Sequence, residues 1–325
     1  MTTIPVAHRP ALGAYTKIVA GCTFLLLLAG AMVTSTGSGL AVPDWPLSFG
    51  KVMPAMEGGV LYEHGHRMVA TFVGALIVVE ALWLWRVEPR RWVRALGWFA
   101  LGGVIVQGAL GGLTVLLRLP DAVSVSHAAL AQLVFGLTVA IAVACSRSWL
   151  QDGAAEAVDA DVPSLFSLAA LACAASYAQI LVGAVVRHTG AGLAIPTFPL
   201  AFGRLVPPLD SFPVAIHFAH RVGSLAVTLL VAWVAVRALR RHGSLPRIVR
   251  PALLLLALVA VQMGLGAWVV LSYKSAWVTS AHLATGALLL ATALTLALRS
   301  RRYVALAPAP AHPPILPHRE PAGAP

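Results

Sequence analysis

Four histidines stand within strongly apolar stretches and form two pairs, His66 with His127 and His220 with His282. An ionisable side chain inside an apolar span is costly and usually functional. Haem iron binds one imidazole on each face of a flat macrocycle, and the haem supplies its own four nitrogens. We therefore expect two bis-histidine haem sites. Two other interpretations stay open, namely histidines that only hydrogen-bond between helices and a zinc or copper site, for which further ligands are not evident.

The residues just before the first histidine of each pair differ between the two copies, EHGHR at 63–67 and HFAHR at 217–221. With a spacing of three, Glu63 shares a helix face with His66. A carboxylate beside a macrocycle can act as a base or stabilise developing positive charge. The alternative is a solvated loop acid at the membrane surface. Arg67 and Arg221 match haem propionates in a bidentate manner, or they extend to lipid headgroups.

Other polar and small residues near these motifs have simpler interpretations. Gln107 and Gln262 are expected to hydrogen-bond between helices rather than to ligate metal. Glycines 108, 111, 112, 264 and 266 would let a helix approach a flat ligand closely, or would serve small-residue helix packing. His64 and His188 have no counterparts in the other half, so we assign them to loops.

The chain contains an internal repeat. Residues 36–54 read TGSGLAVPDWPLSFGKVMP and residues 189–207 read TGAGLAIPTFPLAFGRLVP. The same offset, drifting only from 153 to 155 residues, relates the histidine pairs and Gln107 to Gln262. Since each copy holds an even number of spans, both enter the membrane from the same side, which predicts a parallel repeat about an axis along the membrane normal.

The composition of the chain indicates which kind of secondary structure carries these residues. The sequence is 59% hydrophobic and 11% charged, with a mean hydropathy of +0.84, which indicates a bilayer protein. Runs of about 20 apolar residues, too long for barrel strands, predict transmembrane helices. The fold class is therefore all-α, with eight spans near residues 14–34, 66–86, 95–117, 124–145, 165–186, 214–236, 251–271 and 276–298.

The net charge of +11 is distributed by membrane side rather than gathered as a nucleic-acid-binding patch. With the N-terminus inside, 16 Lys and Arg residues lie on inner segments and 7 on outer ones, which predicts cytoplasmic termini. The expected organisation is a first four-helix bundle (1–146), a cytoplasmic linker (147–163), a second bundle (164–302) and a disordered tail (303–325). The missing presequence suggests a bacterial plasma membrane.

The paired motifs GAMVTSTGSGLAVPDWP with EHGHR, and GAVVRHTGAGLAIPTFP with HFAHR, resemble the haem A synthase family over residues 14 to 300. The resemblance implies oxidation of the C8 methyl group of haem O to a formyl group, through hydroxylated intermediates, to supply haem A to terminal oxidases. It implies that His66 and His127 flank the substrate haem with Glu63 as the catalytic carboxylate. His220 and His282 would hold a haem b cofactor that relays electrons.

The resemblance also suggests partners: the upstream haem O synthase, a farnesyltransferase, and assembly factors of the terminal oxidase. The residues do not identify the electron carrier. Some family members carry outer-loop cysteines, whereas Cys22, Cys145 and Cys173 fall inside expected spans, so no thiol step and no disulfide is expected. The principal rival is a cytochrome b-like dihaem electron-transfer protein, in which neither haem is altered. A duplicated transporter ranks third because broken helices and midplane polar sites are not evident.

Overall fold

The computed structural model describes residues 9–151 and 156–306, and in this part of the chain eight helices are long and apolar enough to cross a membrane. The expected all-α, multi-pass membrane architecture is confirmed. The helices are α1 (Pro10–Ser35), α2 (Gly59–Val87), α3 (Arg91–Leu116), α4 (Asp121–Ala144), α6 (Leu165–His188), α7 (Phe212–His242), α8 (Pro246–Leu271) and α9 (Ala276–Tyr303). The shorter elements are α5 (Arg147–Gln151), η1 (Ala191–Leu193), β1 (Ala157–Asp159) and β2 (Val304–Leu306).

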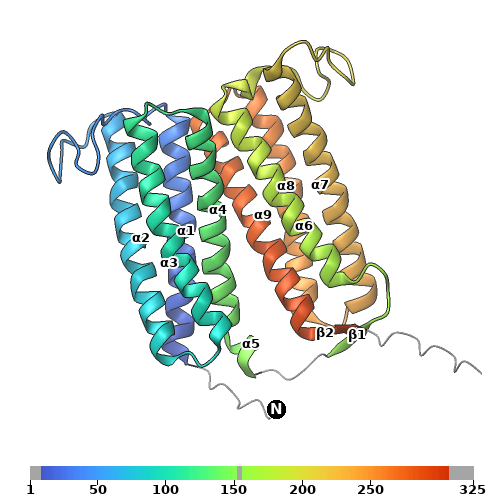
Figure 1. The fold of residues 1–325 in the computed structure, drawn as a ribbon. Coiled ribbons are helices and arrows are strands. Elements are labelled where there is room, and N and C mark those ends of the chain that lie inside the picture. Colours follow the sequence, from blue (N-terminus) through green and yellow to red (C-terminus); the bar gives the residue numbers. More distant parts are fainter. Residues whose placement is uncertain (1–8, 152–155, 307–325) are drawn as a thin grey trace, which may run out of the picture.

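The spanning helices form two groups that stand side by side, α1 to α4 and α6 to α9 (Figure 1). Each group has its own apolar core, centred on residues such as Ile77 and Leu84 in the first and Leu165 and Leu255 in the second. The parallel relation of the halves about an axis along the membrane normal stays a prediction.

Helix α9 is the central element of the molecule. In its apolar 18-residue stretch 56% of the residues are buried inside the protein, against 33% or less in the corresponding stretch of each other spanning helix. It packs on α6 and α8 of its own group and on α1 and α4 of the other. Phe135 of α4 meets Ala287 and Ala291 of α9 in a small apolar cluster. Because α9 also carries His282, this histidine lies on the most enclosed helix.

Helix α2 begins earlier than the hydropathy pattern predicted. The expected span started at residue 66, whereas the helix starts at Gly59. Residues 63–67 therefore lie within the first turns of α2, and the side chains of Glu63 and His64 are buried. The polar EHGHR segment lowers local hydropathy but still folds as helix.

The linker and the chain after α9 are more ordered than expected. Residues 147–151 form α5, and β1 pairs in parallel with β2, in the register Ala157↔Val304 and Asp159↔Leu306. The expectation of a disordered tail from residue 303 thus does not hold for 303–306, because Tyr303 is the last residue of α9 and the backbone of 304–306 pairs with β1. Residues 307–325 lie outside the described part. This small sheet and the long connections at 36–58 and 189–211 occupy opposite ends of the molecule (Figure 1).

Candidate haem-binding sites

The second histidine pair faces across the interior of its bundle. His220 on α7 and His282 on α9 have ring centres 6.4 Å apart, with ring planes at 74°. A metal–imidazole bond is about 2 Å long, so one metal ion held between two rings puts the ring centres roughly 6 Å apart. The observed spacing fits a single iron between His220 and His282.

The first pair has the matching arrangement, with His66 on α2 and His127 on α4. Across the described residues, no group of three or more His, Cys, Asp or Glu side chains could hold a metal ion. Paired imidazoles without further protein ligands suit haem, which brings four nitrogens of its own.

Each of the four imidazole rings lies against a glycine of a neighbouring helix. A Cβ at Gly30 would lie 3.0 Å from Cε1 of His66, and one at Gly183 would lie 3.0 Å from Cε1 of His220. The corresponding distances are 3.2 Å from Gly111 to His127 and 3.1 Å from Gly266 to His282. Gly111 and Gly266 thus serve close packing between neighbouring helices, one of their two expected roles, by making room for the imidazole rings.

The other three glycines singled out in the sequence, Gly108, Gly112 and Gly264, differ in whether another part of the protein packs against them. A Cβ at Gly112 would meet the indole of Trp45, so this glycine serves packing between α3 and the outer loop. Within the described residues nothing lies within 4 Å of a Cβ built at Gly108 or at Gly264. Both positions are exposed, so these two glycines make no close packing contact within the described part of the chain.

The expected interhelical glutamine contacts are confirmed. Nε2 of Gln107 lies 2.9 Å from the carbonyl oxygen of His127 and 3.1 Å from its Nδ1. In the second half, Nε2 of Gln262 lies 3.4 Å from Nε2 of His282. Amide side chains therefore approach the α4 and α9 histidines in both halves.

Glu63 is not a solvated surface acid, because its exposed fraction is only 4%. Its Oε2 accepts a hydrogen bond from the backbone N–H of Val42 at 2.8 Å, and Oε1 lies 2.6 Å from Nη2 of Arg67. Glu63 thus joins α2 to the outer loop. Its position over the edge of a haem stays a prediction.

His217 occupies the place of Glu63 in the second half and makes the equivalent contacts. The backbone N of Ile195 lies 3.3 Å from its Nδ1 and Nε of Arg221 lies 3.4 Å from its Nε2, and a neutral imidazole accepts a hydrogen bond at one of these two nitrogens. Anchoring the outer loop is therefore common to both halves, whereas the carboxylate is special to the first.

Arg67 and Arg221 differ in which of their guanidinium nitrogens donate hydrogen bonds to other protein atoms. Arg67 donates through Nη1 to the carbonyl oxygens of Asp44 and Leu47, and through Nη2 to Val42 and Glu63. Arg221 donates only through Nη2 to the carbonyl oxygens of Ile195 and Thr197, and through Nε to His217. Its Nη1 is buried and has no partner among the described residues. A propionate contact is thus easier to reconcile with Arg221 than with Arg67.

His64 and His188, assigned to loops from the sequence, both lie in helices. His64 is buried in α2, with Nδ1 2.8 Å from Oγ of Ser48. His188 is the last residue of α6. The next residue inward, Arg187, joins the two halves by donating to the carbonyl oxygen of Ala31 at 2.7 Å and to Oγ of Ser35 at 2.8 Å.

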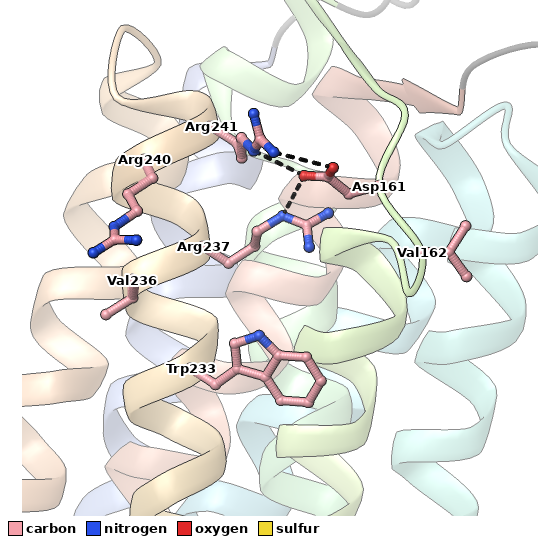
Figure 2. A pocket seen from close by; sticks show the side chains of 7 residues that line it. All are labelled: Asp161, Val162, Trp233, Val236, Arg237, Arg240 and Arg241. Atoms are coloured by element: carbon pink, nitrogen blue, oxygen red, sulfur yellow. Dashed lines mark hydrogen bonds and ion pairs between the residues drawn. The ribbon is translucent and has the colours of Figure 1, made fainter.

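A pocket of about 520 Å³ lies away from the histidines, beside the end of α7 that carries Trp233, Arg237 and Arg241. Figure 2 shows Arg237 and Arg241 turned toward Asp161, with Nε of each about 3 Å from the Asp161 carboxylate. Trp233 lies 13 residues beyond His220, about 20 Å along a helix. This pocket is separate from the histidine sites, and two of its arginines, Arg237 and Arg241, are paired with linker carboxylates.

Comparison with known proteins agrees with these features. Residues 58–294 match the family model COX15-CtaA, described as cytochrome oxidase assembly protein. The chain is similar to the haem A synthase of Symbiobacterium thermophilum, with 36% identity over 77% of this chain and 82% of the relative. It is also similar to the haem A synthase of Halalkalibacterium halodurans, with 33% identity over 79% of this chain and 86% of the relative.

Proposed function

Since the chain belongs to the COX15-CtaA family of cytochrome oxidase assembly proteins, we propose that it is a haem A synthase, an oxidoreductase that converts the C8 methyl group of haem O to a formyl group. The observation that carries the proposal is the repeated histidine pair with a carboxylate in one half only. Both halves present two imidazoles against glycines. Only the first half adds a buried carboxylate, Glu63, one turn before its ligand.

His66 and His127 are the proposed axial ligands of the substrate haem O, with Glu63 as the catalytic carboxylate. Oxidation of a methyl group removes electrons, which must pass to an electron acceptor outside this chain, and releases protons, which a carboxylate near that methyl is suited to accept. Arg67 fixes the Glu63 carboxylate through the contact at 2.6 Å, and the Val42 N–H fixes its other oxygen. The outer loop covers this acid and limits its contact with water.

His220 and His282 are the proposed ligands of a haem b cofactor. When bound, that haem supplies one-electron redox chemistry. The residues of the second half hold and orient it: Gly183 and Gly266 accommodate the two rings, and Arg221 offers a buried donor to a propionate. The acid of the first half is replaced by His217, which is engaged with the loop and with Arg221.

We further propose that the protein lies in a bacterial plasma membrane with both termini in the cytoplasm, as the excess of Lys and Arg on inner segments supports. In this orientation the histidine pairs lie toward the outer face. A long-tailed substrate such as haem O enters from the lipid, which supports transfer from a membrane-bound haem O synthase and delivery of haem A to oxidase assembly factors.

The test is to express the chain together with a haem O source in cells that lack haem A, and to chromatograph the extracted haems. A haem A peak is expected, and it should disappear when His66 is replaced by alanine. Bound haem b and haem O without any haem A would instead identify a dihaem electron-transfer protein.

A further inference from the structure

One face of α7 stays exposed along most of the helix. The side chains of Leu225, Leu229, Trp233 and Val236 are all exposed, and their spacing of three or four residues puts them on the same face. Arg240 lies four residues further along this face and is exposed as well. The face therefore runs from aliphatic side chains through an aromatic ring to a cation.

This face leads into the pocket of about 520 Å³ at the end of α7. Trp233, Val236 and Arg240 line the pocket together with Asp161 and Val162 of the linker. Figure 2 shows Arg240 extending to the other side of α7 from Asp161. The pocket is thus open to the apolar face on one side and bounded by the linker on the other.

The pocket holds more positive than negative charge. Arg237 contacts Asp159 at 3.0 Å and Asp161 at 2.9 Å, and Arg241 contacts Asp161 at 3.0 Å. Arg240 makes no hydrogen bond or ion pair with any residue that the structure describes. Three arginines against two aspartates leave one positive charge, which an anion of single negative charge would neutralise.

A phospholipid with an anionic headgroup combines the properties that this site requires. A guanidinium binds phosphate oxygens through charge-assisted hydrogen bonds. Tryptophan is enriched at the level of the lipid headgroups, where its ring is in the apolar layer and its N–H meets polar groups. Basic pockets on the cytoplasmic side of membrane helices bind anionic headgroups, and the Lys and Arg distribution assigns this end of α7 to that side.

The first half has the cation without its surroundings. At the offset of 154 residues that relates the two halves, Arg86 of α2 corresponds to Arg240, but Val79 corresponds to Trp233. Arg86 is exposed, as Arg240 is. It therefore reports what an arginine at this depth does without the tryptophan.

We propose that the pocket at the end of α7 is a binding site for an anionic phospholipid of the cytoplasmic leaflet. Arg240 supplies the charge that holds the phosphate, Trp233 packs against the glycerol region, and the acyl chains lie along Leu225 and Leu229. The inference goes beyond the proposed function and does not depend on haem at either histidine pair.

The test titrates the full-length, detergent-purified protein with phosphatidylglycerol or with the uncharged-overall phosphatidylcholine, and counts bound lipid by native mass spectrometry. The wild type should bind phosphatidylglycerol more tightly than phosphatidylcholine. Arg240→Gln should weaken phosphatidylglycerol binding by about fivefold, since one arginine near a membrane surface contributes about 1 kcal/mol. Arg86→Gln is the matched control and should leave binding unchanged. Equal affinity of the wild type for the two lipids, or equal losses in the two variants, would overturn the proposal.

A competition separates a lipid site from a site for a free anion, and it needs only the wild type. An excess of inorganic phosphate should leave phosphatidylglycerol bound, because the acyl chains contribute contacts along α7 that phosphate lacks. Displacement of the lipid by phosphate at comparable concentration would show that the pocket takes a soluble anion, and the lipid assignment would be wrong. Trp233→Leu gives a second reading: it should weaken phosphatidylglycerol binding without adding or removing charge, and unchanged binding would contradict the role of the indole.

Discussion

Oε1 of Glu63 lies 2.6 Å from Nη2 of Arg67, one turn further along α2. In the second half, Nε2 of His217 lies 3.4 Å from Nε of Arg221, also one turn apart. Both pairs anchor an outer loop, through the N–H of Val42 or of Ile195. Both halves thus hold the outer loop to the helix through equivalent contacts, and the first half makes them with a carboxylate, Glu63, where the second has an imidazole, His217.

Replacing Glu63 by glutamine removes the charge and keeps an acceptor for the Val42 N–H. We expect both haems to be retained and conversion to slow by about 100-fold or more, as for loss of a general acid or base. Haem O or a hydroxylated intermediate should accumulate, which chromatography of extracted haems would show. His217→Gln is the matched control, since it alters the same anchor in the other half and should leave haem A output near normal. Normal output from Glu63→Gln would remove this residue from the mechanism.

Replacing Gly183 by alanine should weaken haem b binding, because the new Cβ would lie 3.0 Å from Cε1 of His220 and push the ring from its position. We expect haem b affinity to fall by about tenfold, comparable to the loss of a partner that orients a metal ligand. The measurement is the pyridine haemochrome content of the purified protein. Gly21→Ala, in α1, is the control, because nothing in the described residues lies within 4 Å of that Cβ. Equal haem content in the two variants would show that Gly183 does not set the ring position.

The spans and the histidine pairs were predictable because they depend on local hydropathy and on a repeat that the sequence itself displays. The burial of Glu63 was not predictable, because it depends on the outer loop that carries Val42 folding over it, and hydropathy cannot fold that loop. The pairing of β1 with β2 was missed for the same reason, since Ala157 and Val304 are far apart in sequence.

Gln179 is a different case, because the signal was present in the sequence. Alignment of the two halves places Leu26 opposite Gln179 and Val69 opposite Gly223. Its meaning required the structure, which shows that the amide reaches the His220 ring. A polar residue in a membrane span therefore marks a contact, but the partner is found only once the helices are packed.

The linker predicts a pH-dependent stability. Burial alone would raise the pKa of the Asp159 carboxyl, but the N–H groups of Leu165 and Asp161 and the guanidinium of Arg237 outweigh burial and hold this pKa below its ordinary value. Because the folded-state pKa is depressed, the contribution to stability is present above the unfolded-state pKa of about 3.9. It should disappear as the pH falls through the lower folded-state value.

The thermal unfolding temperature of the purified protein, followed at neutral pH and between about pH 5 and pH 2, would measure this loss. Asp159→Asn should lower the unfolding temperature at neutral pH, since it weakens the contact of 3.0 Å with Arg237. The same substitution should have little effect at the acid end, where the wild-type carboxyl is protonated. A constant difference between the two proteins across the whole range would contradict the assigned role.

Nη1 of Arg221, which has no partner among the residues that the structure describes, predicts recognition of a haem propionate in the second half. Arg221→Gln should reduce haem b affinity by about 10- to 100-fold, because a hydrogen bond to a charged group contributes about 1.5 to 3 kcal/mol. The variant also loses loop contacts, so affinity alone does not isolate the propionate. Haem dimethyl ester, which lacks the propionate charges, does isolate it when bound to protein freed of its second-half haem. Wild-type protein should bind haem more tightly than the ester, whereas Arg221→Gln should bind both equally. If the wild type made no distinction between them, Arg221 would serve only the loop, as the engaged guanidinium of Arg67 does in the first half.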